Sequence, residues 1–362
     1  MQLAQITSLL ESIAPLAAAE SWDNVGLLVG DPNQTVSRIM LAIDYTQEVA
    51  DEAKKANCDL VVSYHPPIFQ PLKKLTAGSL IFDAIRHGMA IYSPHTALDA
   101  SDGGTNDTLA DAIGLTDRRP LQLEPSPAAN YKLVVFVPTV HLEKVSKALF
   151  DAGAGHIGNY SSCSFRAEGI GSFFPEADAN PAIGQRGILE QVPETRLEMI
   201  LPIDKAQYVV AALRKAHPYE EPAFDLILLA ADTTGRGQGR IGSLPHTDRG
   251  TIIDHIKRQL DLPHILIAGP ATGAITRAAV CAGSCGKLLD SAISAGAQLY
   301  LTGELRHHDA IKAAAAGVTV ICTLHSNSER AVLKRLKNKL EQTPHMPPIT
   351  IGTTDRDPFT IA

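Results

Sequence analysis

The sequence predicts an α/β protein with a discontinuous main domain, in which two pseudo-equivalent halves share a mixed, largely parallel sheet, and a smaller inserted α+β domain. Short apolar strands alternate with amphipathic helices, which is typical of βαβ units. A layout of strand, polar site and helix at residues 60–99 returns at residues 299–329 and indicates a weak internal duplication. Prolines near residue 125 and glycines at residues 233–239 indicate linkers. We therefore expect one domain at residues 1–127 and 235–362, and an insertion at 128–234.

The first half begins with a helix at residues 2–13, because apolar residues recur there at helical spacing. Thr46 is expected to cap a second helix. Trp22, the single tryptophan, precedes an Asp-Asn-x-Gly turn and is expected to anchor the core, with the alternative that Asp23 and Asn24 face a functional cleft. The remaining elements are expected as strands at 37–44, 60–64 and 89–92 and helices at 46–57, 80–87 and 107–113.

The insertion reads as two β-α-β halves, which suggests a ferredoxin-like module. Strands are expected at 131–137, 194–201 and 224–230, and helices at 141–152 and 205–216. His217 opens the stretch His-Pro-Tyr-Glu-Glu-Pro. We interpret this stretch as a proline-bounded turn rather than as a metal-binding motif.

The last third repeats the pattern of the first. Helices are expected at 248–260, 286–295 and 325–340, and strands at 278–282, 299–301 and 318–322. Cys281 and Cys285 are separated by three residues, which differs from the Cys-x-x-Cys redox spacing, so we interpret both as structural. Gly283 and Ser284 precede a helix, where free backbone N–H groups could bind an anion.

Composition excludes several classes of protein. The net charge of −7, with no basic block, makes nucleic acid an unlikely main partner. No apolar run approaches the ~20 residues that span a bilayer, and the N-terminus does not resemble a signal peptide. Five scattered cysteines indicate a reducing compartment, so a cytoplasmic location is expected.

Four apolar strands each end at histidines or carboxylates. His65 follows one strand and Asp99 follows the next, while His325 follows a strand of the last third with Glu329 four residues later. The carboxyl ends of parallel strands are where α/β sheets bind ligands. Imidazole and carboxylate groups at this helical spacing can share one metal ion. We predict that these four residues bind a divalent metal, for which zinc, iron and manganese are all suitable.

Further titratable groups lie beside these four. Glu304, His307 and His308 follow another strand and are predicted to line the cleft as bases or as residues that orient the ligands. Either His95 or Asp99 is expected to be the ligand in its segment, with the other behind it. The carboxylate is favoured.

These motifs identify a resemblance to the GTP cyclohydrolase 1 type 2-like, or Ngg-interacting-factor-like (Nif-three-like), metal proteins. The matching stretches begin at Ser21 (SWDNVGL), Tyr64 (YHP), His95 (HTALD), Thr302 (TGE) and His325 (HSNSE). The insertion is similar to the family's CutA- or PII-like module. The resemblance covers nearly the whole chain.

The resemblance implies a dinuclear metal centre and a toroidal homohexamer. Many family members carry a second histidine where this chain has Tyr64, so we expect one strong metal site and a weaker second one. The leading hypothesis is a metal-dependent hydrolase whose activated water attacks a small-molecule substrate such as a nucleotide. The alternative is a metal-binding regulatory or interaction protein without turnover.

Overall fold

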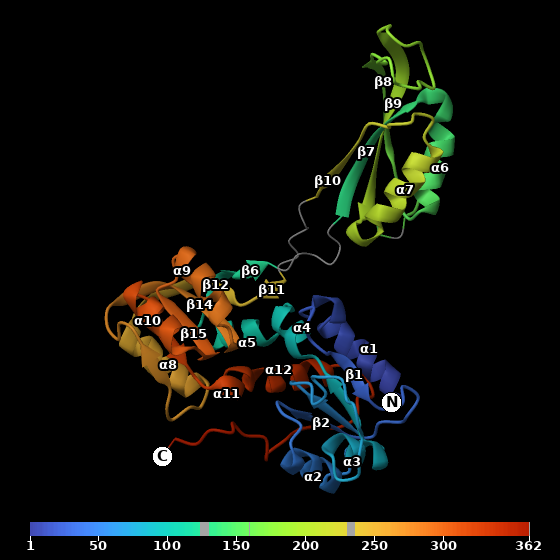
Figure 1. Ribbon diagram of the computed structural model, residues 1–362. Helices are drawn as coiled ribbons and strands as arrows, with labels where there is room; N and C mark the ends of the chain where they lie inside the picture. The colour runs from blue at the N-terminus through green and yellow to red at the C-terminus, as the bar shows by residue number, and fades with distance from the viewer. Residues whose placement is uncertain (124–129, 159, 230–235, 362) are drawn as a thin grey trace. The chain divides into compact units, whose positions relative to one another are not determined.

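The computed structural model describes residues 1–123, 130–158, 160–229 and 236–361. The chain forms two compact units (Figure 1). We call Met1–Glu124 with Gly235–Ala362 the discontinuous unit, and Pro125–Thr234 the inserted unit. The boundaries predicted at 127/128 and 234/235 lie outside the described residues.

The first sheet of the discontinuous unit has the order β1-β4-β3-β2-β17. Its strands are β1 (Gly26–Val29), β2 (Ile39–Ala42), β3 (Leu60–Ser63), β4 (Ala90–Ser93) and β17 (Ile349–Ile351). All are parallel except β1. Helices α1 (Leu3–Ile13) and α12 (Ala331–Leu340) share a core with one face, and α2 (Gln47–Lys55) and α3 (Leu80–Arg86) share a core with the other. Coverage on both faces explains why β2, β3 and β4 are continuously apolar rather than alternating.

The second sheet has the order β13-β16-β15-β14-β12-β5. Its strands are β5 (Thr116–Arg119), β12 (Arg240–Asp248), β13 (Leu266–Ala268), β14 (Ala274–Ser284), β15 (Leu299–Glu304) and β16 (Thr319–Cys322). Helices α5 (Thr105–Ala112) and α8 (Arg249–Gln259) pack on one face, and α9 (Leu289–Ser294) and α10 (His307–Ala315) on the other.

Only β14, β15 and β16 pair in parallel in this second sheet; its other three pairings are antiparallel. The expectation of a largely parallel sheet is therefore wrong for this half. The antiparallel strand β12 was not predicted because Gly242 and Pro245 interrupt its apolar pattern, and its register with β14 shifts between Ser243 and Thr247.

The inserted unit follows the element order β-α-β-β-α-β. Its elements are β7 (Asn130–Pro138), α6 (Leu142–Asp151), β8 (Phe165–Phe173), β9 (Glu190–Pro202), α7 (Ala206–Ala216) and β10 (Phe224–Leu228). The sheet order is β10-β7-β9-β8, and every pair is antiparallel. One face packs on α6 and α7 through the core residues Leu133, Val135 and Leu197. The sequence did not predict β8, because it is mostly exposed and carries Gly169 and Gly171.

Each predicted linker contains a short β-strand at the end that adjoins the discontinuous unit. Strand β6 (Gln122–Leu123) pairs with β11 (Gly237–Gln238) as a two-stranded sheet. These residues were expected to be linker, and the expectation is wrong because their backbone groups pair across the insertion. The remaining helices in the part of the chain that the structure describes are α4 (His95–Ala100), α11 (His325–Glu329) and four short 3₁₀ turns at Leu16–Ala18, Thr139–His141, Ile203–Lys205 and Gly286–Leu288.

Thr46 caps α2 by accepting a hydrogen bond from the Val49 N–H at 3.3 Å, as predicted. Trp22 is 53% exposed, so the expectation of a core anchor is wrong: its ring lies at the surface beside Phe69. Cys281 and Cys285, expected only as structural residues, are joined by a disulfide. None of the helices in the described part of the chain has the length and apolar character that crossing a membrane requires.

Candidate metal centre

Two sheets of the discontinuous unit supply one cluster of side chains. His65 follows β3 of the first sheet, whereas His325 and Glu329 are the first and last residues of α11, beyond β16 of the second sheet. Leu324 precedes His325 with a φ of 71°, and His95 begins α4 with a φ of 27°. Such left-handed backbone at non-glycine residues is costly and concentrates at functional sites.

Glu329 lies between the two imidazoles. His65 Nε2 is 3.3 Å from Glu329 Oε2, and His325 Nε2 is 3.4 Å from Glu329 Oε1. The three ligand atoms that His65, His325 and Glu329 offer all lie within 4.8 Å of one another. Three of the four predicted ligands therefore converge, although they come from opposite ends of the chain.

Carboxylates behind the histidines orient their rings. His65 Nδ1 lies 2.9 Å from Asp44 Oδ1, and His325 Nδ1 lies 2.9 Å from Glu304 Oε1. A proton on each Nδ1 leaves Nε2 as the free lone pair, which is the arrangement that metal-ligating histidines commonly adopt. Both Nε2 atoms face Glu329.

A third imidazole has the same support. His95 Nδ1 lies 2.8 Å from Asp23 Oδ1, and the His95 ring centroid is 5.3 Å from that of His65. Thr96 also donates its hydroxyl to Asp23 at 2.5 Å. The alternative that Asp23 contributes to the site thus fits the geometry, since it holds His95 in place.

The hydrogen bonding of Glu329 also indicates that the cluster can hold a divalent cation, independently of the sequence motif. Glu329 is 3% exposed, and its Oε2 atom has no hydrogen-bond donor among the described residues. A Cβ built at Gly283 would lie 2.8 Å from Glu329 Oε1 and 3.4 Å from His325 Nε2, so this glycine leaves room beside the cluster. Two imidazole nitrogens and a carboxylate suit zinc, iron or manganese. The three residues are therefore a candidate metal-binding triad.

The carboxylates also set the protonation of the cluster. Burial lowers the pKa of His65, but the hydrogen bond with Asp44 and the negative charges of Asp44 and Glu329 outweigh it and raise the pKa to about 10. Without a cation, His65 therefore binds a proton at neutral pH. A metal ion and this proton compete for the same Nε2 atom.

Asp99, the fourth predicted ligand, is not one of the three converging groups. It accepts a hydrogen bond from the Tyr64 hydroxyl, which in turn accepts one from Thr105 Oγ1 at 3.2 Å. Burial and the nearby charge of Glu329 raise the pKa of Asp99 to about 6. Burial also raises the pKa of Tyr64 well above its usual value, so Tyr64 remains a protonated phenol.

The residues predicted to act in catalysis lie in different places. Glu304 is engaged by His325 Nδ1 and so orients a ligand, which is one of its two predicted roles. His307 and His308 are exposed at the start of α10, with ring centroids 5.3 Å apart. In the described ranges, neither histidine forms a hydrogen bond, an ion pair or a ring contact with the triad.

Sequence reasoning missed Asp44. Its signal was present, because Asp44 follows the buried strand β2 by two residues, in the layout that singled out His65 and Asp99. No histidine accompanies it in its own segment, so the carboxylate did not stand out as part of a ligand set.

The fold and the triad define an α/β protein with a candidate histidine–carboxylate metal-binding site. Residues 1–358 match the family model described as Duf34/NIF3 (NGG1p interacting factor 3), and this chain belongs to that family.

Similar proteins span the whole chain. A protein of Halalkalibacterium halodurans named "GTP cyclohydrolase 1 type 2 homolog" is 38% identical over 98% of this chain and 97% of its own length. The protein of the same name in Bacillus subtilis is 37% identical over 98% of this chain and 97% of its own length. A crystal structure titled as a Bacillus cereus protein related to NIF3 is 35% identical and covers 100% of this chain and 99% of its own, with a TM-score of 0.67.

Proposed function

We propose that this chain is a divalent-metal-dependent hydrolase that acts on a nucleotide or a related small molecule. The observation that carries the proposal is Glu329, whose buried and otherwise unpartnered Oε2 faces the Nε2 atom of His65. An orphaned buried carboxylate oxygen is costly unless a ligand satisfies it. The relatives' name, "GTP cyclohydrolase 1 type 2 homolog", supports the nucleotide class.

Different residues of the site would bind the cation, orient the imidazoles and transfer a proton. His65, His325 and Glu329 would hold the cation, while Asp44 and Glu304 keep the imidazoles in the productive tautomer. A bound divalent cation supplies Lewis acidity, by which water becomes a nucleophile near neutral pH. His95, held by Asp23 beside His65, is placed to take or return a proton. His307 and His308 remain predicted to assist from the rim.

A cavity of about 400 Å³ in the discontinuous unit supports an anionic substrate, and its lining residues Ser284 and Leu305 are neighbours in sequence of Gly283 and Glu304. Ser284 and Gly286 line it together with the cationic side chains of Lys287 and Arg306. The Asp309 carboxylate lines it as well, and Lys287 Nζ pairs with Glu20 Oε1 at 2.9 Å, which leaves Arg306 as the cation available to an anion. Ser284 follows Gly283, the residue whose Cβ would meet the triad, and pairs with Glu304 in the sheet. We assign this cavity to a phosphate or another anionic group of the substrate.

We further propose one strong metal site and a weaker second one. Tyr64 stands where the family resemblance implies a second histidine, and a protonated phenol is a poor ligand. Tyr64→His should increase metal content per chain after identical reconstitution, measured by elemental analysis. A full two metals per chain in the wild type would contradict the proposal of unequal sites.

We also propose the domain architecture and the homohexameric assembly that the family resemblance implies. The β-α-β-β-α-β order of the inserted unit supports a ferredoxin-like domain, and the triad drawn from two sheets supports two pseudo-equivalent halves. The homohexamer rests on the resemblance alone, and light scattering coupled to size-exclusion chromatography tests it.

Turnover by the reconstituted full-length chain tests the hydrolase. Protein loaded with zinc, manganese or iron(II) would be assayed against GTP, a p-nitrophenyl phosphodiester and dihydrouracil. We expect turnover of at least one substrate, its loss in His325→Ala, and its retention in His264→Ala, a variant at an exposed histidine of the same unit. Tight metal binding without turnover of any substrate would contradict the hydrolase and favour the regulatory alternative.

A further inference from the structure

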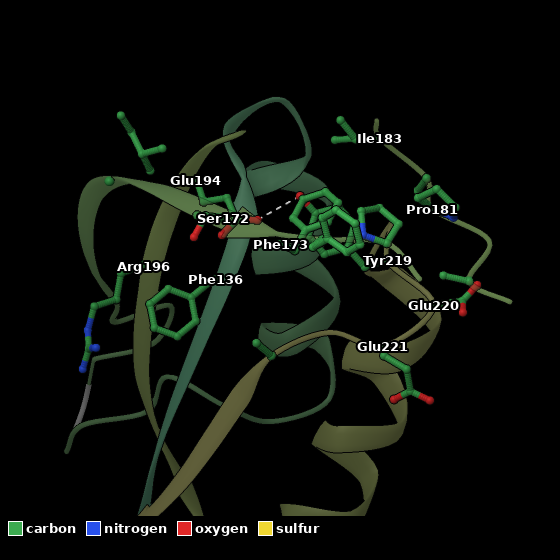
Figure 2. A pocket seen from close by; sticks show the side chains of 18 of the residues that line it. Phe136, Ser172, Phe173, Pro181, Ile183, Glu194, Arg196, Tyr219, Glu220 and Glu221 are labelled. Atoms are coloured by element: carbon green, nitrogen blue, oxygen red, sulfur yellow. Dashed lines mark hydrogen bonds between the residues drawn. The ribbon is translucent and has the colours of Figure 1, made fainter. Parts of the chain in front are cut away.

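The inserted unit contains a cavity of its own, with a volume of about 780 Å³. Pockets of roughly 300–1,000 Å³ hold most small-molecule ligands. All of the residues that line this one belong to the inserted unit, so it is separate from the triad (Figure 2). Nothing in the proposed hydrolase reaction uses it.

The strand register explains why this face of the sheet is hollow. Leu133, Val135 and Leu197 point toward α6 and α7, so the alternate residues Phe136, Glu194 and Arg196 point to the opposite face. On β8, Gly169 pairs with Glu194, and Gly171 shares its face two residues further on. Two missing side chains beside Glu194 leave a trough, which residues 174–183 border.

Glu194 is a buried carboxylate, 8% exposed, at the wall of this cavity. Its Oε1 atom accepts a hydrogen bond from the Tyr219 hydroxyl at 2.8 Å. Its Oε2 atom lies against the backbone of Gly171, where an added Cβ would come within 2.1 Å, and accepts no hydrogen bond in the part of the chain that the structure describes.

Among the described residues of the inserted unit, no cation pairs with this carboxylate. Across the described residues, no lysine, arginine or histidine nitrogen lies within 4.0 Å of Glu194. Arg196 is committed elsewhere, with its Nε 2.8 Å from Glu198 and its guanidinium over the Phe136 ring. The Tyr219 N–H donates to His217 Nδ1, so His217 Nε2 carries the proton that it donates to the Phe136 carbonyl. This histidine is neutral, and burial lowers its pKa further.

Aromatic and apolar side chains form the rest of the wall. The rings of Phe173 and Tyr219 lie 5.7 Å apart, and Ile183 and Pro181 also line the cavity (Figure 2). Glu220 and Glu221 add negative charge at its edge, where Figure 2 draws their side chains. Aromatic faces attract both flat rings and cations.

We propose that this cavity binds an organic cation with a planar apolar body, whose ammonium or amidinium group pairs with Glu194. The aromatic wall takes the flat body, and the free Oε2 atom accepts from the cationic head. A metal ion is a poorer match, because Glu194 is accompanied there by a phenol and aromatic rings rather than by imidazoles.

Tryptamine is a suitable probe, with indole-3-acetate as its charge-reversed counterpart. Calorimetric titration of the full-length chain should show saturable tryptamine binding with a Kd below about 1 mM. Indole-3-acetate should not bind, because Glu194 would repel its carboxylate. Equal binding of the two compounds, or no tryptamine binding, would overturn the proposal, and this comparison needs no variant.

Variants then locate the site. Glu194→Gln keeps the shape but removes the charge and should weaken tryptamine binding roughly ten- to hundredfold. Glu168→Gln removes an exposed carboxylate from the rim and serves as the matched control, with an expected change below about threefold. Unchanged binding in a folded Glu194→Gln, or an equal loss in both variants, would contradict the assignment to Glu194.

Discussion

Glu329 and Glu194 are both buried carboxylates, and their neighbours give them different ligands. Glu329 faces two imidazole Nε2 atoms at 3.3 and 3.4 Å, each backed by another carboxylate. Glu194 has one phenol at 2.8 Å and otherwise meets glycine backbone and aromatic rings. Converging nitrogen and oxygen lone pairs suit a metal ion, whereas a single carboxylate in an apolar cavity suits an organic cation.

A third buried carboxylate shows what happens when the chain supplies the cation itself. Asp107 receives Arg240 Nε at 2.9 Å and Nη2 at 3.0 Å in a bidentate pair, and the Arg240 side chain is 2% exposed. Arg240 also donates to the carbonyls of Gly237 and Gly239. Asp107 therefore needs no ligand, which makes it the internal reference for the other two.

The largest expected effect comes from removing that internal cation. Arg240→Met should lower the free energy of unfolding of the discontinuous unit by about 3–5 kcal/mol, because it removes the buried bidentate partner of Asp107 and leaves it the more distant Arg118, whose Nε lies 3.4 Å from Asp107 Oδ1. Urea denaturation followed by circular dichroism measures the change. Arg258→Met, at an exposed arginine of α8, is the control and should cost less than about 1 kcal/mol. Equal costs would mean that the pairing of Asp107 is not what stabilises this region.

Removing a ligand of the triad should have the next largest effect. His325→Ala should weaken zinc binding by more than about a hundredfold, since a lost ligand costs more than a lost outer partner. Competition with a chromophoric chelator measures the affinity. Tryptamine binding to the inserted unit should remain unchanged, and a parallel loss there would break the distinction between the two sites.

Removing the carboxylate that orients a ligating histidine should weaken metal binding less than removing the histidine itself. Asp44→Asn should weaken zinc binding by roughly 10–100-fold, because the amide holds the His65 ring less firmly in the tautomer that frees Nε2. Asp51→Asn, at an exposed carboxylate of α2, is the matched control. Zinc affinity equal to that of the wild type in Asp44→Asn would show that the contact with His65 Nδ1 does not serve the metal.

The smallest effect concerns pH. Burial raises the pKa of Asp107, but the hydrogen bonds and charge of Arg240 outweigh it, and the net shift is downward. The stabilisation is therefore fully present above the ordinary pKa of about 3.9 and is lost as pH falls through the lower folded-state value. The stability difference between wild type and Asp107→Asn should be constant between about pH 5 and 7 and shrink below about pH 4. A difference that widens on acidification in thermal unfolding would show that the sign is wrong.

The sequence alone predicted most strands of the first sheet, because buried parallel strands appear in a sequence as unbroken apolar runs that end at polar or turn-forming residues. It also pointed to the candidate triad of His65, His325 and Glu329, since both histidines lie within three residues of the end of such a strand and Glu329 lies one helical turn after His325. The strands it missed are those whose pairing depends on distant partners. Strand β8 is exposed and glycine-containing, and β12 is interrupted by Pro245.

Only the tertiary structure decided which carboxylate serves which histidine. Asp44, Asp23 and Glu304 lie 21, 72 and 21 residues from the imidazoles they hold, and no local spacing encodes those pairs. The same reason applies to Trp22, whose apolar bulk predicted burial but whose turn places it at the surface. It applies to Glu194 as well, because its isolation follows from a sheet register that puts two glycines beside it. Local patterns determine the elements and the side chains at their ends, while long-range packing decides which of those side chains meet.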